Sequence, residues 1–163
     1  MKTNFLYIIL TSIVLLSCSS QKDALKLNDT IVKANNDLRI ASETFNKQFE
    51  AVSDNNYAVL EVDRQNMVNM IEKKITEISA EKSGMPGGDD FKNTFVDYYK
   101  FEKNIYEEEY KEICRLTGAE GDREKLTNIA MRMQAKTDRE DAMEKSIHTE
   151  QAKFAKKNNL KLE

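Results

Sequence analysis

Three glutamates and one arginine are placed where a helical protein would bring charged side chains together in its interior. Glu102 and Glu109 lie in the middle of one apolar helical face, and Glu140 points inward near the level of Glu102. Folding the chain about a turn at Pro86 brings Arg64 near the level of Glu109. Because unpaired buried carboxylates are costly, the four residues predict either a carboxylate-lined ligand or metal site, or ion-pair layers at the helix seams. Ion-pair layers are the favoured interpretation.

Catalytic and metal chemistry is limited by the single histidine, His148. Di-iron bundles of the ferritin type use a Glu and a His three residues apart on each of two helices, whereas Glu144 here lies four residues before the one histidine. Cys114, the candidate thiol nucleophile, is expected to lie about a helix length from His148. The sequence therefore predicts no enzyme, no metal centre and no cofactor.

Methionines are frequent in the predicted helical segments 55–83 and 123–157, and thioethers are ligands for Cu(I). They occur at core spacing, however, without a dense Met-rich tract. Filling of the core by adaptable side chains is the better interpretation for this set, namely Met67, Met70, Met131, Met133 and Met143.

Three tyrosines form a second stripe beside the apolar face that carries Glu102. Tyr99, Tyr106 and Tyr110 recur at helical spacing on its flank. Aromatic side chains are enriched where proteins bind one another, so the stripe is a candidate surface for a protein partner. The alternative is a wide buried face whose hydroxyl groups reach solvent.

Helical periodicity predicts the elements that carry these residues. Four segments, at about 23–52, 55–83, 91–117 and 123–157, place apolar residues three or four positions apart. The first stripe is the clearest, with Leu27, Ile31, Ala34, Leu38, Ala41, Phe45, Phe49 and Val52. Segments 84–90 and 118–122 are turn signals, whereas 53–56 lacks Gly and Pro and leaves open a bend within one long helix.

Short connections between amphipathic helices predict an all-α, up-down-up-down four-helix bundle. The composition agrees, since about a third of the residues are charged and only one proline and five glycines interrupt helix. The net charge of −3 argues against a general nucleic-acid binder.

A short apolar run precedes the predicted bundle. Residues 5–16 are almost wholly apolar, too few for a membrane-spanning helix but enough for the core of a secretory signal peptide. The run ends in Leu15-Leu16-Ser17-Cys18, which resembles the lipobox of bacterial lipoproteins. The resemblance implies cleavage after Ser17 and lipidation of Cys18, which would hold the chain at a membrane. Two or more acyl chains are enough for stable anchoring.

The expected layout follows from that resemblance. Residues 1–17 are a signal peptide, 18–22 are the lipidated cysteine and a short tether, and 23–163 form the bundle. Ser19, rather than Asp, follows the anchor and resembles an outer-membrane sorting signal. We expect a non-enzymatic lipoprotein of the bacterial envelope, on the periplasmic or the surface-exposed face of the outer membrane, that binds a protein partner. The alternative is a bundle that binds a small ligand or metal among its interior carboxylates.

Overall fold

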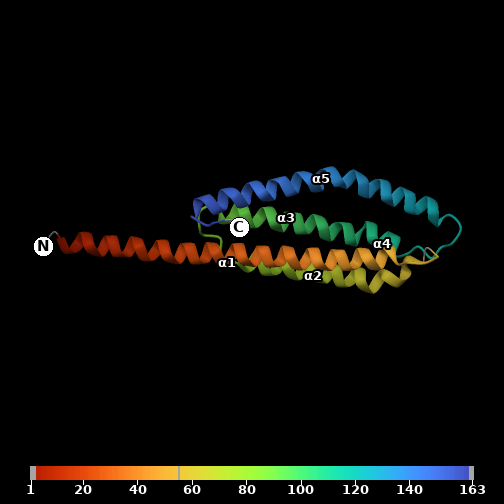
Figure 1. Ribbon diagram of the computed structural model, residues 1–163, viewed down its shortest axis with the longest axis horizontal. Coiled ribbons are helices and arrows are strands. Elements are labelled where there is room, and N and C mark those ends of the chain that lie inside the picture. The colour runs from red at the N-terminus through yellow and green to blue at the C-terminus, as the bar shows by residue number, and fades with distance from the viewer. Residues whose placement is uncertain (1–2, 55, 162–163) are drawn as a thin grey trace.

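Four long helices lie side by side along one axis in the computed structural model (Figure 1). The structure describes residues 3–54 and 56–161, and side chains from residue 20 onward. The helices are α1 (Thr3–Glu50), α2 (Glu61–Ala80), α3 (Gly88–Glu107) and α5 (Asp122–Lys157), with the short η1 (Tyr57–Leu60) before α2 and α4 (Glu109–Ile113) after α3. The all-α prediction is confirmed, since the described residues form no strand beyond one isolated bridge between Asn56 and Thr117.

The first helix carries the clearest predicted stripe. Ala24, Leu27, Ile31, Ala34, Leu38 and Phe45 are all buried, as the three- and four-residue spacing predicts. Helix α1 begins at Thr3 rather than near residue 23, because no Gly or Pro interrupts the chain before that point. It ends at Glu50, and Asp54 then adopts a left-handed conformation with φ 56°. The chain therefore leaves the helix at residues 51–54 and does not continue as one long bent helix.

The second and third predicted helices differ from the expected 55–83 and 91–117. Helix α2 begins later because the Tyr57 amide donates to the Leu116 carbonyl oxygen at 2.9 Å, and a 3-10 turn precedes it. The helix expected over 91–117 is interrupted at Glu108, whose φ of −107° and ψ of −74° separate α3 from α4.

Contacts between the connections close the bundle at both ends. The Tyr57–Leu116 hydrogen bond joins the segment after α1 to the segment after α4. At the opposite end, the Asn158 side chain donates to the Pro86 carbonyl oxygen at 2.9 Å. There, the Phe91 and Phe154 rings stack with centroids 4.5 Å apart and join α3 to α5.

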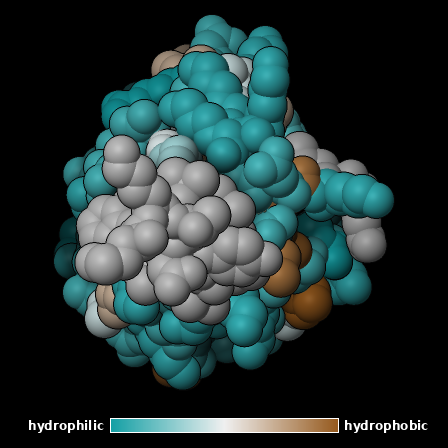
Figure 2. Space-filling view, turned by 90° about the vertical axis from the view of Figure 1, so that its left-hand side faces the viewer, coloured by the Kyte–Doolittle hydropathy of each residue, from teal (hydrophilic) through white to brown (hydrophobic). Residues whose placement is uncertain are grey.

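The end of the bundle from which the first turns of α1 project is mainly hydrophilic (Figure 2). Exposed lysines at this end include Lys22, Lys26, Lys156 and Lys157. Leu25 is a large apolar residue exposed beside them. Among the described residues, no helix combines the length and the apolar character that a membrane span requires.

Candidate functional site

Arg64 does not join the carboxylates with which it was expected to pair. Its guanidinium is buried, and it donates to both carboxylate oxygens of Glu61, at 2.6 and 2.8 Å, one turn earlier on α2. A third hydrogen bond, of 3.1 Å, goes to the Tyr106 carbonyl oxygen next to the break between α3 and α4. Arg64 therefore ties α2 to the end of α3.

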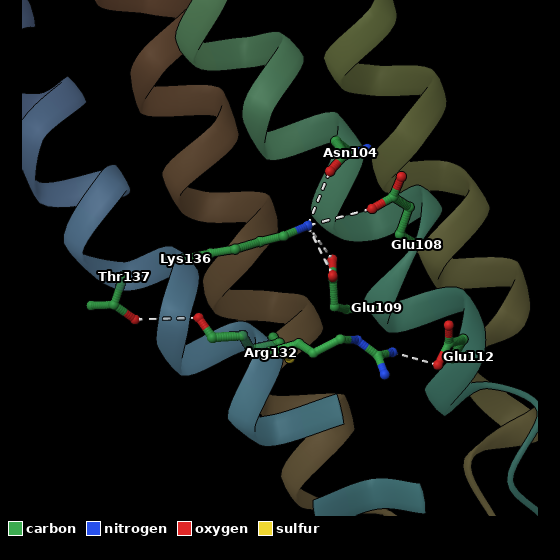
Figure 3. Close-up of polar contacts among 8 residues, drawn as sticks. Asn104, Glu108, Glu109, Glu112, Arg132, Lys136 and Thr137 are labelled. Atoms are coloured by element: carbon green, nitrogen blue, oxygen red, sulfur yellow. Dashed lines mark hydrogen bonds and ion pairs between the residues drawn. The ribbon is translucent and has the colours of Figure 1, made fainter. Parts of the chain in front are cut away.

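Glu109 is the buried member of an ion pair. Its side chain is 4% exposed, and the Lys136 ammonium of α5 lies 2.8 Å from its carboxylate. Lys136 also donates to Asn104 Oδ1 at 3.0 Å and to Glu108 Oε2 at 3.5 Å, as the dashed lines in Figure 3 show. The ion-pair interpretation thus describes Glu109, with a lysine that sequence reasoning did not identify.

Glu102 and Glu140 line a cleft of about 420 Å³ between α1, α3 and α5. Glu102 comes from α3, and Glu140 faces it from α5. The polar side chains that surround them in the cleft come from these three helices and from α4, and include Ser42, Tyr98, Tyr106, Tyr110 and Glu144. Of the four predicted interior residues, the structure brings these two together and places Arg64 and Glu109 elsewhere.

The Glu102 carboxylate is enclosed without a complete set of partners. Its Oε1 is buried and accepts no hydrogen bond from any described residue. Burial, with the nearby Glu140 and Glu144 charges, raises the pKa of Glu102 to about 7, although the Tyr98 hydroxyl partly offsets this effect. Burial and the charge of Glu144 likewise raise the pKa of Glu140. The cleft therefore holds more negative charge than its own side chains compensate.

The three tyrosines do not form an exposed partner surface, which corrects that expectation. Tyr99 is 0% exposed and Tyr106 is 4% exposed, while Tyr110 is partly buried. The reason is that α3 packs against α1, α2 and α5, so its aromatic flank is covered as well as its apolar face. Tyr106 and Tyr110 stack with ring centroids 4.9 Å apart and form part of the cleft wall.

Sequence reasoning did not assign three cleft residues, Ser42, Tyr98 and Glu144. A signal was present for two of them, because Tyr98 lies one turn before Glu102 and Glu144 lies one turn after Glu140. Ser42 gave no such signal, and its proximity to the Tyr106 hydroxyl, 3.4 Å away, depends on how α1 packs on α3.

The acidic lining does not converge as a metal site would. Among the described residues, no three His, Cys, Asp or Glu side chains lie close enough together to hold a metal ion. The predicted lipidation site, Cys18, lies within the backbone of α1, but its side chain is outside the described residues.

The acidic cleft can bind a cation by hydrogen bonds to carboxylate oxygens and by contact with aromatic rings.

Comparison with protein-family models, with curated proteins and with solved structures finds no match for this chain.

Proposed function

We propose that the chain is a lipid-anchored, non-enzymatic protein of the bacterial envelope that binds a small organic cation in the acidic cleft between α1, α3 and α5. The observation that carries this proposal is the enclosed Oε1 of Glu102, which accepts no hydrogen bond from the described residues and lies in a cleft with three further carboxylates, those of Glu43, Glu140 and Glu144. A buried carboxylate without a partner is costly, and a bound ammonium would supply both the donor and the opposite charge.

The charges around the cleft support a cationic ligand. Arg39 is the basic side chain in the cleft lining, and its guanidinium is held by Glu43 at 2.6 Å. Glu102, Glu140 and Glu144 are thus left without a cation from the lining. The volume is within the range of ligand sites, which are commonly several hundred Å³.

The aromatic lining supports an organic cation over a bare metal ion. Tyr98, Tyr106 and Tyr110 all contribute to the wall. An alkylammonium that donates to Glu102 would lie against this aromatic wall, and cation–π contacts contribute about 0.5–2 kcal/mol. A small metal ion would leave these rings unused.

The proposed architecture is the up-down-up-down four-helix bundle, in which α4 continues the line of α3. The Tyr57–Leu116 contact at one end supports this reading, because it brings the connection after α1 to the connection after α4. The Asn158–Pro86 contact supports it at the other end, because it brings the end of α5 to the connection between α2 and α3. In such a bundle, α1 and α5 face each other across the cleft.

Anchoring through Cys18 rests on the lipobox resemblance, and the charge near that end of α1 supports it. Exposed Lys22, Lys26, Lys156 and Lys157 would lie toward a membrane surface once Cys18 is acylated. Each lysine near an anionic surface contributes about 1 kcal/mol. We place the protein in the outer membrane, on its periplasmic or surface-exposed face.

Fractionation tests the anchor independently of the cleft. Replacement of Cys18 by Ser is expected to move the protein from the membrane fraction to the soluble fraction. Retention of the Cys18→Ser chain in the membrane would overturn the lipid anchor, while leaving the cleft proposal intact.

Calorimetric titration with n-butylammonium at pH 8 tests the cleft. We expect binding that weakens at least tenfold in Glu102→Gln. Glu107→Gln is the matched control, because it removes the same charge from an exposed position on the same helix, and it should bind as the wild type does. The proposal fails if butylammonium does not bind, or if both variants bind equally well.

A further inference from the structure

We propose that the ligand is a single-chain amphiphile, with its cationic head at Glu102 and its hydrocarbon tail in an apolar groove beneath α5. This inference rests on the proposed function and adds the class of the ligand. The groove has a volume of about 470 Å³, and its apolar wall is formed by Phe49, Tyr57, Ile113, Leu126, Ala130 and Met133.

The groove and the acidic cleft are neighbours along the same helices. Ile105, Tyr110, Met133 and Glu140 line both of them. A molecule bound in the cleft can therefore extend past these shared side chains into the groove.

Helix α5 changes character along the face that covers both spaces. Leu126, Ala130 and Met133 line the groove, Glu140 lines both spaces and Glu144 lines the cleft. The polar Gln134, Lys136 and Thr137 also line the groove, between Met133 and Glu140 in sequence, and the Lys136 ammonium is held by Glu109. Helix α3 and its continuation change in the same direction, from Glu102 through Ile105 to Ile113. The combined space is acidic at one end and apolar at the other, which is the polarity pattern of an amphiphilic cation.

The groove exists because the middle of α5 is not packed into the core. Ile129 and Ile147 are buried, and no side chain of α5 between them is. The inward positions in that stretch are held by Met133, Lys136 and Glu140, each only partly buried. Figure 1 shows α5 bowing outward over this part of the bundle.

The length of the groove suits an extended chain. From Glu140 to Leu126 the helix rises by about 21 Å at 1.5 Å per residue. The buried floor, which includes Ile113, Leu116 and Ile129, continues under this span. A decyl chain can lie along this floor, so that both its methylene groups and the apolar groove wall are buried from water.

Titration of the full chain carrying Cys18→Ser with alkylammonium salts of increasing length tests the inference. Butyl-, octyl- and decylammonium are compared by calorimetry at pH 8, below their micellar concentrations. Each added pair of methylene groups is expected to strengthen binding severalfold, and by about fifteenfold where both groups are fully buried. Decanoate should bind at least tenfold more weakly than decylammonium, because its carboxylate would meet Glu102, Glu140 and Glu144.

Ala130→Trp fills the groove from an exposed position on α5. It should abolish the advantage of decylammonium over butylammonium while leaving butylammonium binding unchanged. Ala135→Trp is the matched control, since Ala135 is exposed on the same helix and lines a separate, charged hollow.

The outcomes separate the two proposals. If butylammonium does not bind, the cleft proposal fails and this inference fails with it. If butylammonium binds but decylammonium binds no more tightly, this inference alone is overturned, whatever the variants do. Equal binding of decanoate and decylammonium would overturn the placement of the head group.

Discussion

Glu102 and Glu109 share one predicted helical face, yet the structure gives them different surroundings. Both lie on the inward face of the α3–α4 segment, seven residues apart. Glu109 faces Lys136 at 2.8 Å, whereas Glu102 faces Glu140, and one of its oxygens accepts no hydrogen bond from the described residues. The residue opposite, and not the glutamate itself, makes one position part of the scaffold and the other a candidate binding group.

The opposing residues lie one turn apart on α5. Lys136 and Glu140 present opposite charges to the same side of the bundle. Breaking a buried pair costs about 3–5 kcal/mol, because it leaves an uncompensated charge. The bundle avoids that cost at Glu109 and retains a related cost at Glu102. A site that retains such a cost is where a ligand gains most from binding.

The largest effect is expected from Lys136→Met, which leaves the buried Glu109 carboxylate without its cation. The free energy of unfolding should fall by about 3 kcal/mol at pH 8, measured by urea denaturation. The double variant Lys136→Met/Glu109→Gln removes the stranded charge and should recover most of that loss. Equal losses in the single and double variants would show that the ion pair does not stabilise this region.

Glu102→Gln, in contrast to Lys136→Met, should increase the free energy of unfolding at pH 8. With a pKa of about 7 in the folded chain, Glu102 binds a proton more tightly there than in the unfolded chain. Its stabilising contribution is therefore complete below about pH 4.5 and is lost as the pH rises to about 7, a loss of about 2–3 kcal/mol. Glu102→Gln should lack this decline and be more stable than the wild type at pH 8.

Urea denaturation of both chains at pH 4.5, 6 and 8 measures that difference. The charged and phenolic side chains that face Glu102, namely Glu140 and Glu144 on α5, Tyr98 on α3 and Arg39 on α1, are present in both chains, so the comparison reports the effect of the Glu102 carboxyl in these surroundings. Parallel stability curves for the wild type and Glu102→Gln would contradict the raised pKa.

Glu140→Lys would place a lysine opposite Glu102, as Lys136 already lies opposite Glu109. The new ammonium is placed to pair with Glu102, so the pKa of Glu102 should fall and the chain should gain about 1 kcal/mol at pH 8. Calorimetry should find that butylammonium binding is lost, because the site then carries its own cation. Undiminished butylammonium binding would show that the cation does not lie between Glu102 and Glu140.

The sequence predicted the helices better than it predicted the partners of their polar residues. The α1 stripe and the start of α5 depend on local spacing and turn signals, and both agree with the structure. The break at Glu108 has no Gly or Pro to announce it. Arg64 pairs one turn away on its own helix, a local alternative that competes with the expected contact across the bundle.

For a related reason, the sequence could not decide whether the tyrosine stripe is a partner surface or a wide buried face. Helical spacing shows which residues share a face, but not how many neighbouring helices cover that face. Helix α3 packs against three others, so Tyr99 and Tyr106 became part of the interior. The Lys136–Glu109 pair depends in the same way on the register of α5 against α3 and α4.

The smallest effect is expected from Tyr99→Phe. This variant tests a neutral buried hydroxyl without a hydrogen-bond partner, for comparison with the charged Glu102 carboxylate. The Tyr99 hydroxyl is buried and has no hydrogen-bond partner among the described residues. Removing it should stabilise the chain by up to about 1 kcal/mol, without a change in pH dependence. Thermal unfolding at pH 5 and pH 8 measures this, and a clear loss of stability would indicate that the hydroxyl has a partner in solution.

An NMR titration of the Glu102 side-chain carboxyl, with and without butylammonium, tests most directly whether this group is an uncompensated carboxylate that a cation satisfies. The predicted pKa is about 7 in the free protein, with a marked decrease when butylammonium is bound. A pKa near the ordinary 4.5 in the free protein, or one that butylammonium leaves unchanged, would contradict the proposed role of Glu102.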